Sequence, residues 1–200
     1  MVTFGSVDLL HEDAVKFIEH LWDEAARYGG PGAFELTKTS SAWHEAGHAV
    51  VSATFGIVPT RVQIWRARGL SGRLLLPHAW VGRVTGTLPV HVDDDSPVES
   101  DHKEAVMALS GVVAEILFDP DFRCGSSLRE VAEAIAIAGA IGVKTGTDEQ
   151  AVYQDIYNDT VARLMAHEPI VRAIAVELMH KRIVRLRKLA AHLAPIARRK

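Results

Sequence analysis

The chain has few of the features that would place it outside a reducing compartment or inside a membrane. Cys124 is the single cysteine among 200 residues, which excludes an intramolecular disulfide and a zinc cluster built from cysteines. The first eight residues lack a basic region followed by an apolar run, and the most apolar stretch, residues 131–143, is too short to cross a bilayer. We therefore expect a cytoplasmic protein that is not inserted in a membrane.

A strong charge of one sign is missing as well. The formal net charge of -3 and the pI near 6.4 give no general attraction to nucleic acid or to an anionic surface. With 48% hydrophobic and 24% charged residues, the composition is that of a globular chain with its own core. We expect no nucleic-acid partner, and we expect the basic residues near the end to form a solvated face: Lys181, Arg182, Arg185, Arg187, Lys188 and residues 198–200.

The sequence does contain His44-Glu45-Ala46-Gly47-His48, which has the spacing of the zinc-hydrolase signature H-E-x-x-H. Four residues advance a helix by a little over one turn, so both imidazoles project from one face and can take two corners of a zinc tetrahedron. Glu45, on the adjacent edge, could take a proton from a water at the metal and pass it to a leaving amine. The alternative is two partly buried histidines on an ordinary amphipathic helix.

Apolar periodicity and breaking residues predict a mainly α-helical α+β chain. The motif should lie on a helix over about residues 41–55, with an N-cap at Ser40 or Ser41 and with Gly47 leaving room for a neighbouring backbone or substrate. Short extended runs between residues 60 and 88 predict two or three strands of a small sheet. Other helices are expected over about residues 7–28, 98–118, 127–141, 149–167 and 169–180, the last with a continuation to 193 left open, and a glycine-rich linker at 29–32.

Beyond the two histidines, residues 42–51 resemble the peptidase domain of the FtsH-type ATP-dependent zinc metalloproteases. The likeness continues through residues 58–77, which include Leu-Ser-Gly-Arg-Leu-Leu-Leu-Pro, and through Leu109–Phe118, which contains an Ala-Glu pair and ends in an aromatic residue. It covers about residues 40–195 and not the ATPase module. The resemblance implies a zinc peptidase domain over residues 33–200, with its small sheet packed against the motif helix, after an N-terminal helix and linker over residues 1–32.

In that family the third zinc ligand is an aspartate near the start of a helix. The corresponding stretch here places Glu130 at that position, with one residue inserted after Gly125, so the resemblance implies a site of His44, His48 and Glu130. The residues themselves leave other interpretations open. Ser127 and Glu130 also match a helix capping box, and the other carboxylates or imidazoles that could be the third ligand are Glu115, then Asp101, His102 and Glu104.

The expected activity is that of a zinc metalloendopeptidase that cleaves unfolded or extended polypeptides without using ATP itself. The substrate should lie as a strand against the edge at residues 72–76, with Gly72, Leu74 and Leu75 as substrate-binding residues. Because no ATPase module is present, folded substrates would need a separate unfoldase, and the helical tail would allow a homo-oligomer by family analogy. Two alternatives stay open: a metal-stabilised binding or regulatory module that has lost proteolysis, and a small-molecule amidase on the same scaffold.

Overall fold

The computed structural model describes residues 37–66, 69–71, 74–76, 80–86, 96–120 and 128–197. The helix expected over residues 7–28 and its linker lie outside these ranges. The elements are α2 (Lys38–Thr54), β1 (Pro59–Arg66), β2 (Gly69–Ser71), β3 (Leu74–Leu76), β4 (Trp80–Gly86), α3 (Pro97–Phe118), α4 (Leu128–Thr145), α5 (Glu149–Ala166), α6 (Glu168–Lys181), β5 (Ile183–Arg185) and α7 (Leu186–Ala197). Helices dominate and accompany a small antiparallel sheet, so the expected α+β class is confirmed.

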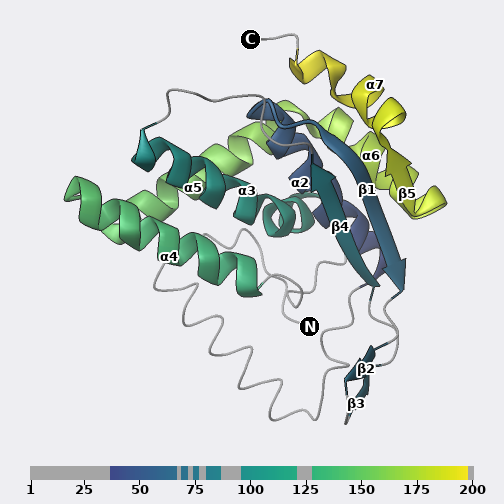
Figure 1. The fold of residues 1–200 in the computed structure, drawn as a ribbon, viewed down its shortest axis with the longest axis horizontal. Helices are drawn as coiled ribbons and strands as arrows, with labels where there is room; N and C mark the ends of the chain where they lie inside the picture. The colour runs from purple at the N-terminus through teal and green to yellow at the C-terminus, as the bar shows by residue number, and fades with distance from the viewer. Residues whose placement is uncertain are drawn as a thin grey trace.

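The motif helix α2 runs through the middle of the fold and contacts α3, α5, α6 and α7 as well as strands β1 and β4 (Figure 1). The expected N-cap at Ser40 or Ser41 is wrong, because the Thr37 hydroxyl caps the helix and accepts the Ser40 N–H at 2.9 Å. Both serines are instead buried in the first turn. Small apolar side chains allow α2 to pack closely against these neighbouring elements. Five of them are fully buried: Ala42, Ala46, Ala49, Val50 and Val51.

Helices α2 and α3 approach each other very closely at Gly47. A Cβ atom at this position would overlap with the backbone oxygen of Ser110 and lie 2.6 Å from the Cβ of Ala114. The missing side chain therefore makes room for a neighbouring backbone, one of the two uses expected from the sequence. This close contact brings the residues of α3 directly against the imidazoles of the motif.

The main sheet has three antiparallel strands in the order β4-β1-β5. Strand β1 pairs with β4 along its length and with β5 over three residues, where Val62 lies opposite Val184. Val62, Ile64 and Val184 are buried, and β1 and β4 both contact α2. Strand β4 is an edge strand in the described part of the chain, and strands β2 and β3 form a separate two-stranded sheet.

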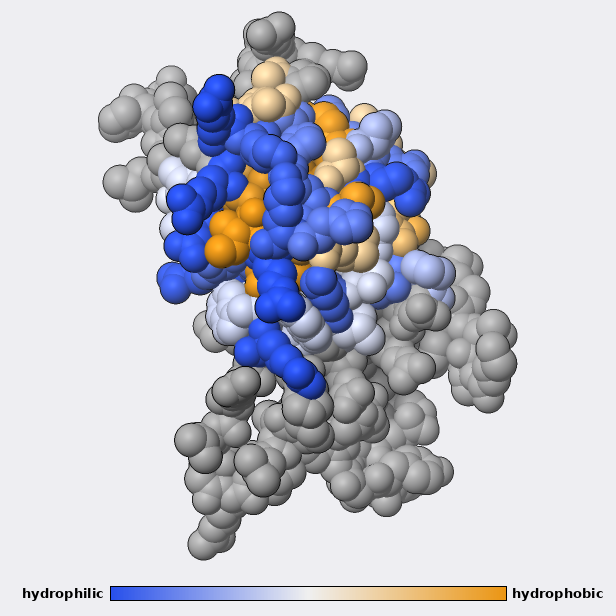
Figure 2. Space-filling view, turned by 90° about the vertical axis from the view of Figure 1, so that its right-hand side faces the viewer, coloured by the Kyte–Doolittle hydropathy of each residue, from blue (hydrophilic) through white to orange (hydrophobic). Residues whose placement is uncertain are grey.

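The end of the described chain returns to the sheet through a short strand that the sequence analysis did not predict. Helix α6 ends at Arg182, which adopts the left-handed conformation with φ 62°, and β5 and α7 follow. Among the residues that Figure 2 colours on the face at the right of Figure 1, hydrophilic ones predominate, with hydrophobic residues between them. The expected solvated character of the basic residues is confirmed where they are described, because Lys181, Arg182, Arg185, Arg187 and Lys188 are exposed.

None of the described helices combines the length and the apolar character that crossing a membrane would require.

Candidate metal centre

Three side chains from two helices converge on one point. His44 and His48 come from α2, and Glu130 comes from the first turn of α4. The two Nε2 atoms lie 3.0 Å apart, and Oε1 of Glu130 lies 3.2 Å from each of them. Ligand atoms around a tetrahedral zinc are separated by about 3.3–3.4 Å, given zinc–ligand bonds of about 2.0–2.1 Å. The triangle therefore has nearly the dimensions of three corners of a zinc tetrahedron, and it forms a candidate metal site.

The unpartnered oxygen of Glu130 and the chemistry of the three ligands also fit a divalent cation. The second carboxylate oxygen of Glu130, Oε2, is buried and has no hydrogen-bond partner in the described part of the chain. An acceptor removed from water without a donor is costly, and a cation would supply the missing partner. Two imidazole nitrogens and a carboxylate form a common catalytic zinc set that leaves a coordination position open. The residues present thus fit zinc in distance and in chemistry.

Both imidazoles are oriented by hydrogen bonds at their other ring nitrogen. Nδ1 of His44 lies 2.6 Å from Oε1 of Glu115, and Nδ1 of His48 lies 3.0 Å from the Met107 carbonyl oxygen and 2.9 Å from Oγ of Ser110. When Nδ1–H donates to these acceptors, the lone pair of Nε2 points into the cluster. These hydrogen bonds therefore hold both rings in the orientation that metal ligation needs, with Nε2 toward the cluster.

The other candidates for third ligand lie elsewhere. The carboxylate of Glu115 is 1% exposed and lies behind His44, where its Oε2 accepts a hydrogen bond from the Ser40 hydroxyl. It supports a ligand and is not one of the three converging atoms. Asp101 pairs with Lys144 at 2.5 Å, His102 lies 3.4 Å from Asp159, and Glu104 is exposed.

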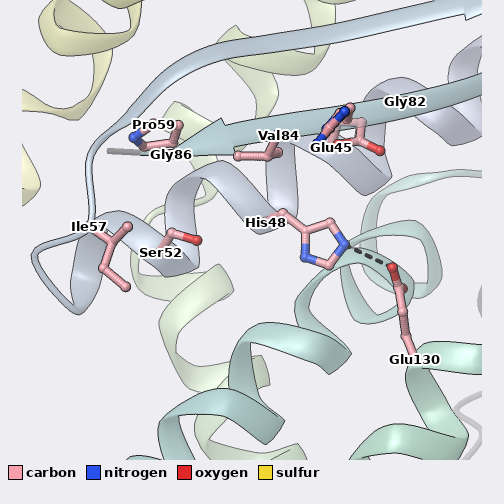
Figure 3. A pocket seen from close by; sticks show the side chains of 10 residues that line it. Glu45, His48, Ser52, Ile57, Pro59, Gly82, Val84, Gly86 and Glu130 are labelled. Carbon is pink, nitrogen blue, oxygen red and sulfur yellow. Dashed lines mark hydrogen bonds and ion pairs between the residues drawn. The ribbon is translucent and has the colours of Figure 1, made fainter. Parts of the chain in front are cut away.

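The capping-box interpretation of Glu130 has a partner outside the described residues, since Ser127 is not among them. The carboxylate of Glu130 points toward the two histidines, as Figure 3 shows for His48. The structure thus brings together all three residues that the family resemblance implied.

The charges of the cluster are strongly coupled. Burial disfavours the charged form of His44, but hydrogen bonds with Glu115 and Glu130 outweigh burial and raise the pKa of His44 to about 10. Burial would raise the pKa of Glu130, but hydrogen bonds with His44 and His48 outweigh it and lower that pKa to about 2. The metal-free cluster therefore holds a proton on His44 between two carboxylates, and a metal ion must displace that proton to bind.

Glu45 lies beside the cluster, under strand β4. Its side chain is buried, and a Cβ atom at Gly82 would overlap with it, so the strand passes directly over the carboxylate. Burial raises the pKa of Glu45, and this effect outweighs the nearby histidines, which would lower it. A carboxylate with a raised pKa is a better proton acceptor near neutral pH. The position and environment of Glu45 suit a general base.

An open pocket of about 420 Å³ connects these groups to solvent (Figure 3). The described residues that line it are Glu45, His48, Ser52, Ile57, Pro59, Gly82, Arg83, Val84, Gly86 and Glu130. The strand beside the metal site is therefore β4, whose role the sequence analysis missed. A glycine within a predicted strand, such as Gly82, was the available signal, because it often marks a close approach by another group.

The substrate-binding assignment from sequence remains a prediction. Gly72 lies outside the described residues, and Leu74 and Leu75 belong to β3 in the separate two-stranded sheet. The chain was also compared with known proteins, and neither a family model nor a curated protein matches it. A functional assignment therefore rests on the residues and geometry of this chain.

Proposed function

We propose that the chain is a zinc-dependent endopeptidase of the FtsH-like type that cleaves extended or unfolded polypeptides. One observation carries the proposal: Nε2 of His44, Nε2 of His48 and Oε1 of Glu130 form a triangle of zinc dimensions beside the buried carboxylate of Glu45. A structural metal site would need the three ligands but would not need a base at its edge. The open pocket adjoining the site gives a substrate access to both.

Each residue has a distinct role in this proposal. A zinc ion held by His44, His48 and Glu130 would polarise the scissile carbonyl group and lower the pKa of a water molecule. Glu45 accepts the proton from the attacking water and returns it to the leaving amine, and its raised pKa favours the first of these transfers. Glu115 acts through His44, because it fixes the orientation of the imidazole without touching the substrate.

Strand β4 is the natural place for a polypeptide substrate. In the described part of the chain it pairs with β1 on one side, which leaves its other edge free to hydrogen-bond an extended peptide. The same strand passes over Glu45 at Gly82, so a peptide added to it would lie next to the base and the ligands. Binding through the peptide backbone explains why only extended segments would be accepted.

The test combines metal analysis with cleavage of an unfolded protein. The purified chain should bind about one zinc per molecule and cleave a chemically denatured, fluorescently labelled protein. Glu45→Gln keeps the size of the side chain and should retain the zinc, while cleavage falls by about a hundredfold to ten-thousandfold, the usual contribution of a general base. Zinc binding without cleavage of any unfolded protein would favour a binding module. A chain that binds no zinc would overturn the site itself.

A further inference from the structure

The pocket beside the metal site has two chemically different ends. Glu45, His48 and Glu130 form one end, and Figure 3 shows Ile57, Pro59 and Gly86 grouped at the other. The second end is a contact between the turn after α2 and the last residues of β4. We name it the Ile57 pocket and define it by Ser52, Ile57, Pro59, Val84 and Gly86.

The Ile57 pocket has an apolar wall. Arg83, which also lines the larger pocket, is exposed and falls by strand alternation on the side of β4 opposite to Val84. Ile57 and Val84 are half-buried and Pro59 is buried, so their apolar surfaces are fixed by the surrounding fold. The single hydroxyl, Oγ of Ser52, makes a weak contact of 3.9 Å with the sulfur of Met107. A charged side chain placed here would lose water without gaining a partner, whereas an apolar one would gain contacts.

The pocket also lies at a suitable distance from the reacting groups. Side chains alternate along a strand, so Gly82, Val84 and Gly86 fall on one side of β4. Gly82 covers Glu45, and Val84 is two residues further, which corresponds to about 7 Å along an extended chain. A substrate strand beside β4 has the same spacing, so the side chain in the pocket belongs to a residue within about two positions of the scissile bond.

Gly86 determines how large that side chain can be. It is not among the glycines with a positive φ, so its backbone conformation is open to other residues. A Cβ atom at Gly86 would lie 3.6 Å from Cγ2 of Ile57, an ordinary van der Waals distance, and would meet no other atom within 4 Å. Alanine at this position would therefore narrow the pocket by one methyl group without straining the fold.

We propose that the Ile57 pocket selects an uncharged apolar side chain of the substrate close to the scissile bond, and that Gly86 sets the upper limit of its size. The inference rests on the proposed peptidase function, because it assumes that a peptide lies along β4. The Ile57 pocket would thus select substrates by side chain, whereas backbone contacts with β4 alone would accept any extended sequence.

The test measures peptide binding separately from cleavage. Fluorescein-labelled nonapeptides of glycine and serine, with Ala, Leu, Phe or Asp at the central position, are titrated into zinc-loaded Glu45→Gln chain. The Leu peptide should bind at least about tenfold more tightly than the Asp peptide. Adding Gly86→Ala should weaken binding of the Phe peptide about tenfold relative to the Ala peptide, since a methyl group in an apolar pocket has effects of this size.

Two further variants serve as controls. Ile57→Ala enlarges the pocket and should shift the preference from Leu toward Phe. Thr85→Ala changes the exposed opposite side of β4 and should leave every binding ratio unchanged. Equal affinities for the Leu and Asp peptides, ratios that Gly86→Ala does not change, or no binding of any peptide to the folded zinc-loaded chain would each overturn the proposal.

The same peptides, given to the chain with Glu45 intact, separate this inference from the proposed function. Cleavage with no preference among the central residues would leave the peptidase standing and overturn the pocket. No cleavage, together with the expected binding ratios, would leave the pocket standing and overturn the peptidase.

Discussion

The two sides of the metal site are built in opposite ways. On the α3 side, two helices meet at glycines, and the carboxylate of Glu115 behind His44 is only 1% exposed. On the β4 and α4 side, the side chain of Glu130 is 28% exposed and an open pocket reaches the ligands. We call these the closed side and the open side of the site.

The comparison separates positioning from reaction. The closed side holds both imidazoles through Nδ1 and leaves them little room to turn, so a metal would find its two nitrogen ligands already placed. The open side carries Glu130 and Glu45, and in the proposed function these serve as third ligand and base beside the strand that binds the substrate. Changes on the closed side should therefore affect folding and metal binding together, whereas changes on the open side should affect metal binding or specificity alone.

The largest effect is expected for Gly111→Ala on the closed side. The added Cβ would lie 2.5 Å from Cε1 of His44 and 2.6 Å from Nε2 of both histidines, so both ligands must move. We expect zinc affinity to fall at least about a hundredfold. Overpacking destabilises the fold by about 1–3 kcal/mol, whereas alanine in place of glycine stabilises a helix by about 1 kcal/mol. The free energy of unfolding should therefore fall by about 1 kcal/mol in total.

Competition with a chromogenic chelator measures the zinc affinity, and urea unfolding of the metal-free chain measures the stability. Gly86→Ala on the open side is the matched control, because its new methyl group meets only Ile57 at 3.6 Å. It should keep the zinc affinity of the parent chain. If Gly111→Ala also kept it, the closed side would not constrain the ligands as described.

The open side should show the reverse pattern with Glu130→Ala. Removing the only carboxylate among the three converging groups should lower zinc affinity about a hundredfold, because two imidazoles alone hold the ion weakly. The free energy of unfolding of the metal-free chain should change by less than about 1 kcal/mol, because the lost hydrogen bonds with His44 and His48 are offset by removal of the buried, unpartnered Oε2. Glu133→Ala, an exposed residue of the same helix, is the control and should change neither quantity.

The motif side of this architecture could be predicted from the sequence, because it depends on local periodicity. The spacing of His44 and His48 favoured a helix, and helices α2 to α6 lie within a few residues of the ranges expected. Helix α7 was expected at most as a continuation of α6, and it is a separate helix after β5. Strand β5 was missed because three residues within a basic run carry no period of their own, and their pairing with β1 comes from tertiary contact.

The hydrogen bonds that orient the two imidazoles could not be predicted, because they depend on where α3 crosses α2. Glu115 was considered as a ligand, and Ser40 as a cap, but a sequence does not show that the two meet behind His44. Glu130 was implied by the family resemblance, whereas the local pattern around it was equally typical of a capping box. The role of Gly82 became visible only when β4 was seen to lie over Glu45.

A smaller effect on the closed side is expected for Glu115→Gln. The amide keeps the size of the side chain and an oxygen for one hydrogen bond, but it loses the charge that orients His44. Changes of this kind lower metal affinity by about tenfold to a hundredfold. Chelator competition measures the loss, and Ser40→Ala, which removes only the hydroxyl that donates to Glu115, should lose less. Unchanged zinc affinity in Glu115→Gln would mean that the carboxylate serves packing alone.

The smallest effect on stability is expected at Glu177, away from the site, where α6 meets α7. This residue tests whether the contrast between the closed and open sides is confined to the metal centre. Hydrogen bonds from Lys188, His192 and Lys181 hold the carboxylate of Glu177, and they outweigh its partial burial and lower its pKa to about 2. Because the folded pKa is below its ordinary value of 4.5, the stabilisation is complete above about pH 4.5 and is lost as the pH falls toward 2. Because Lys181 and Lys188 are half-exposed, solvent screens their attraction to Glu177, and the stabilisation should amount to only about 1 kcal/mol.

Urea unfolding of the metal-free parent chain and of Glu177→Gln, at several values between pH 7 and pH 2.5, measures this contribution. The two free energies should differ by about 1 kcal/mol at neutral pH and converge in acid. Glu168→Gln, which breaks a pair with Arg172 on the same helix, provides the exposed comparison and should show a smaller difference. Zinc affinity at neutral pH should be the same in all three chains, because α6 and α7 contribute none of the ligands and none of the side chains that orient them. A loss of zinc affinity in Glu177→Gln would show that the closed side extends through α6 into the rest of the core.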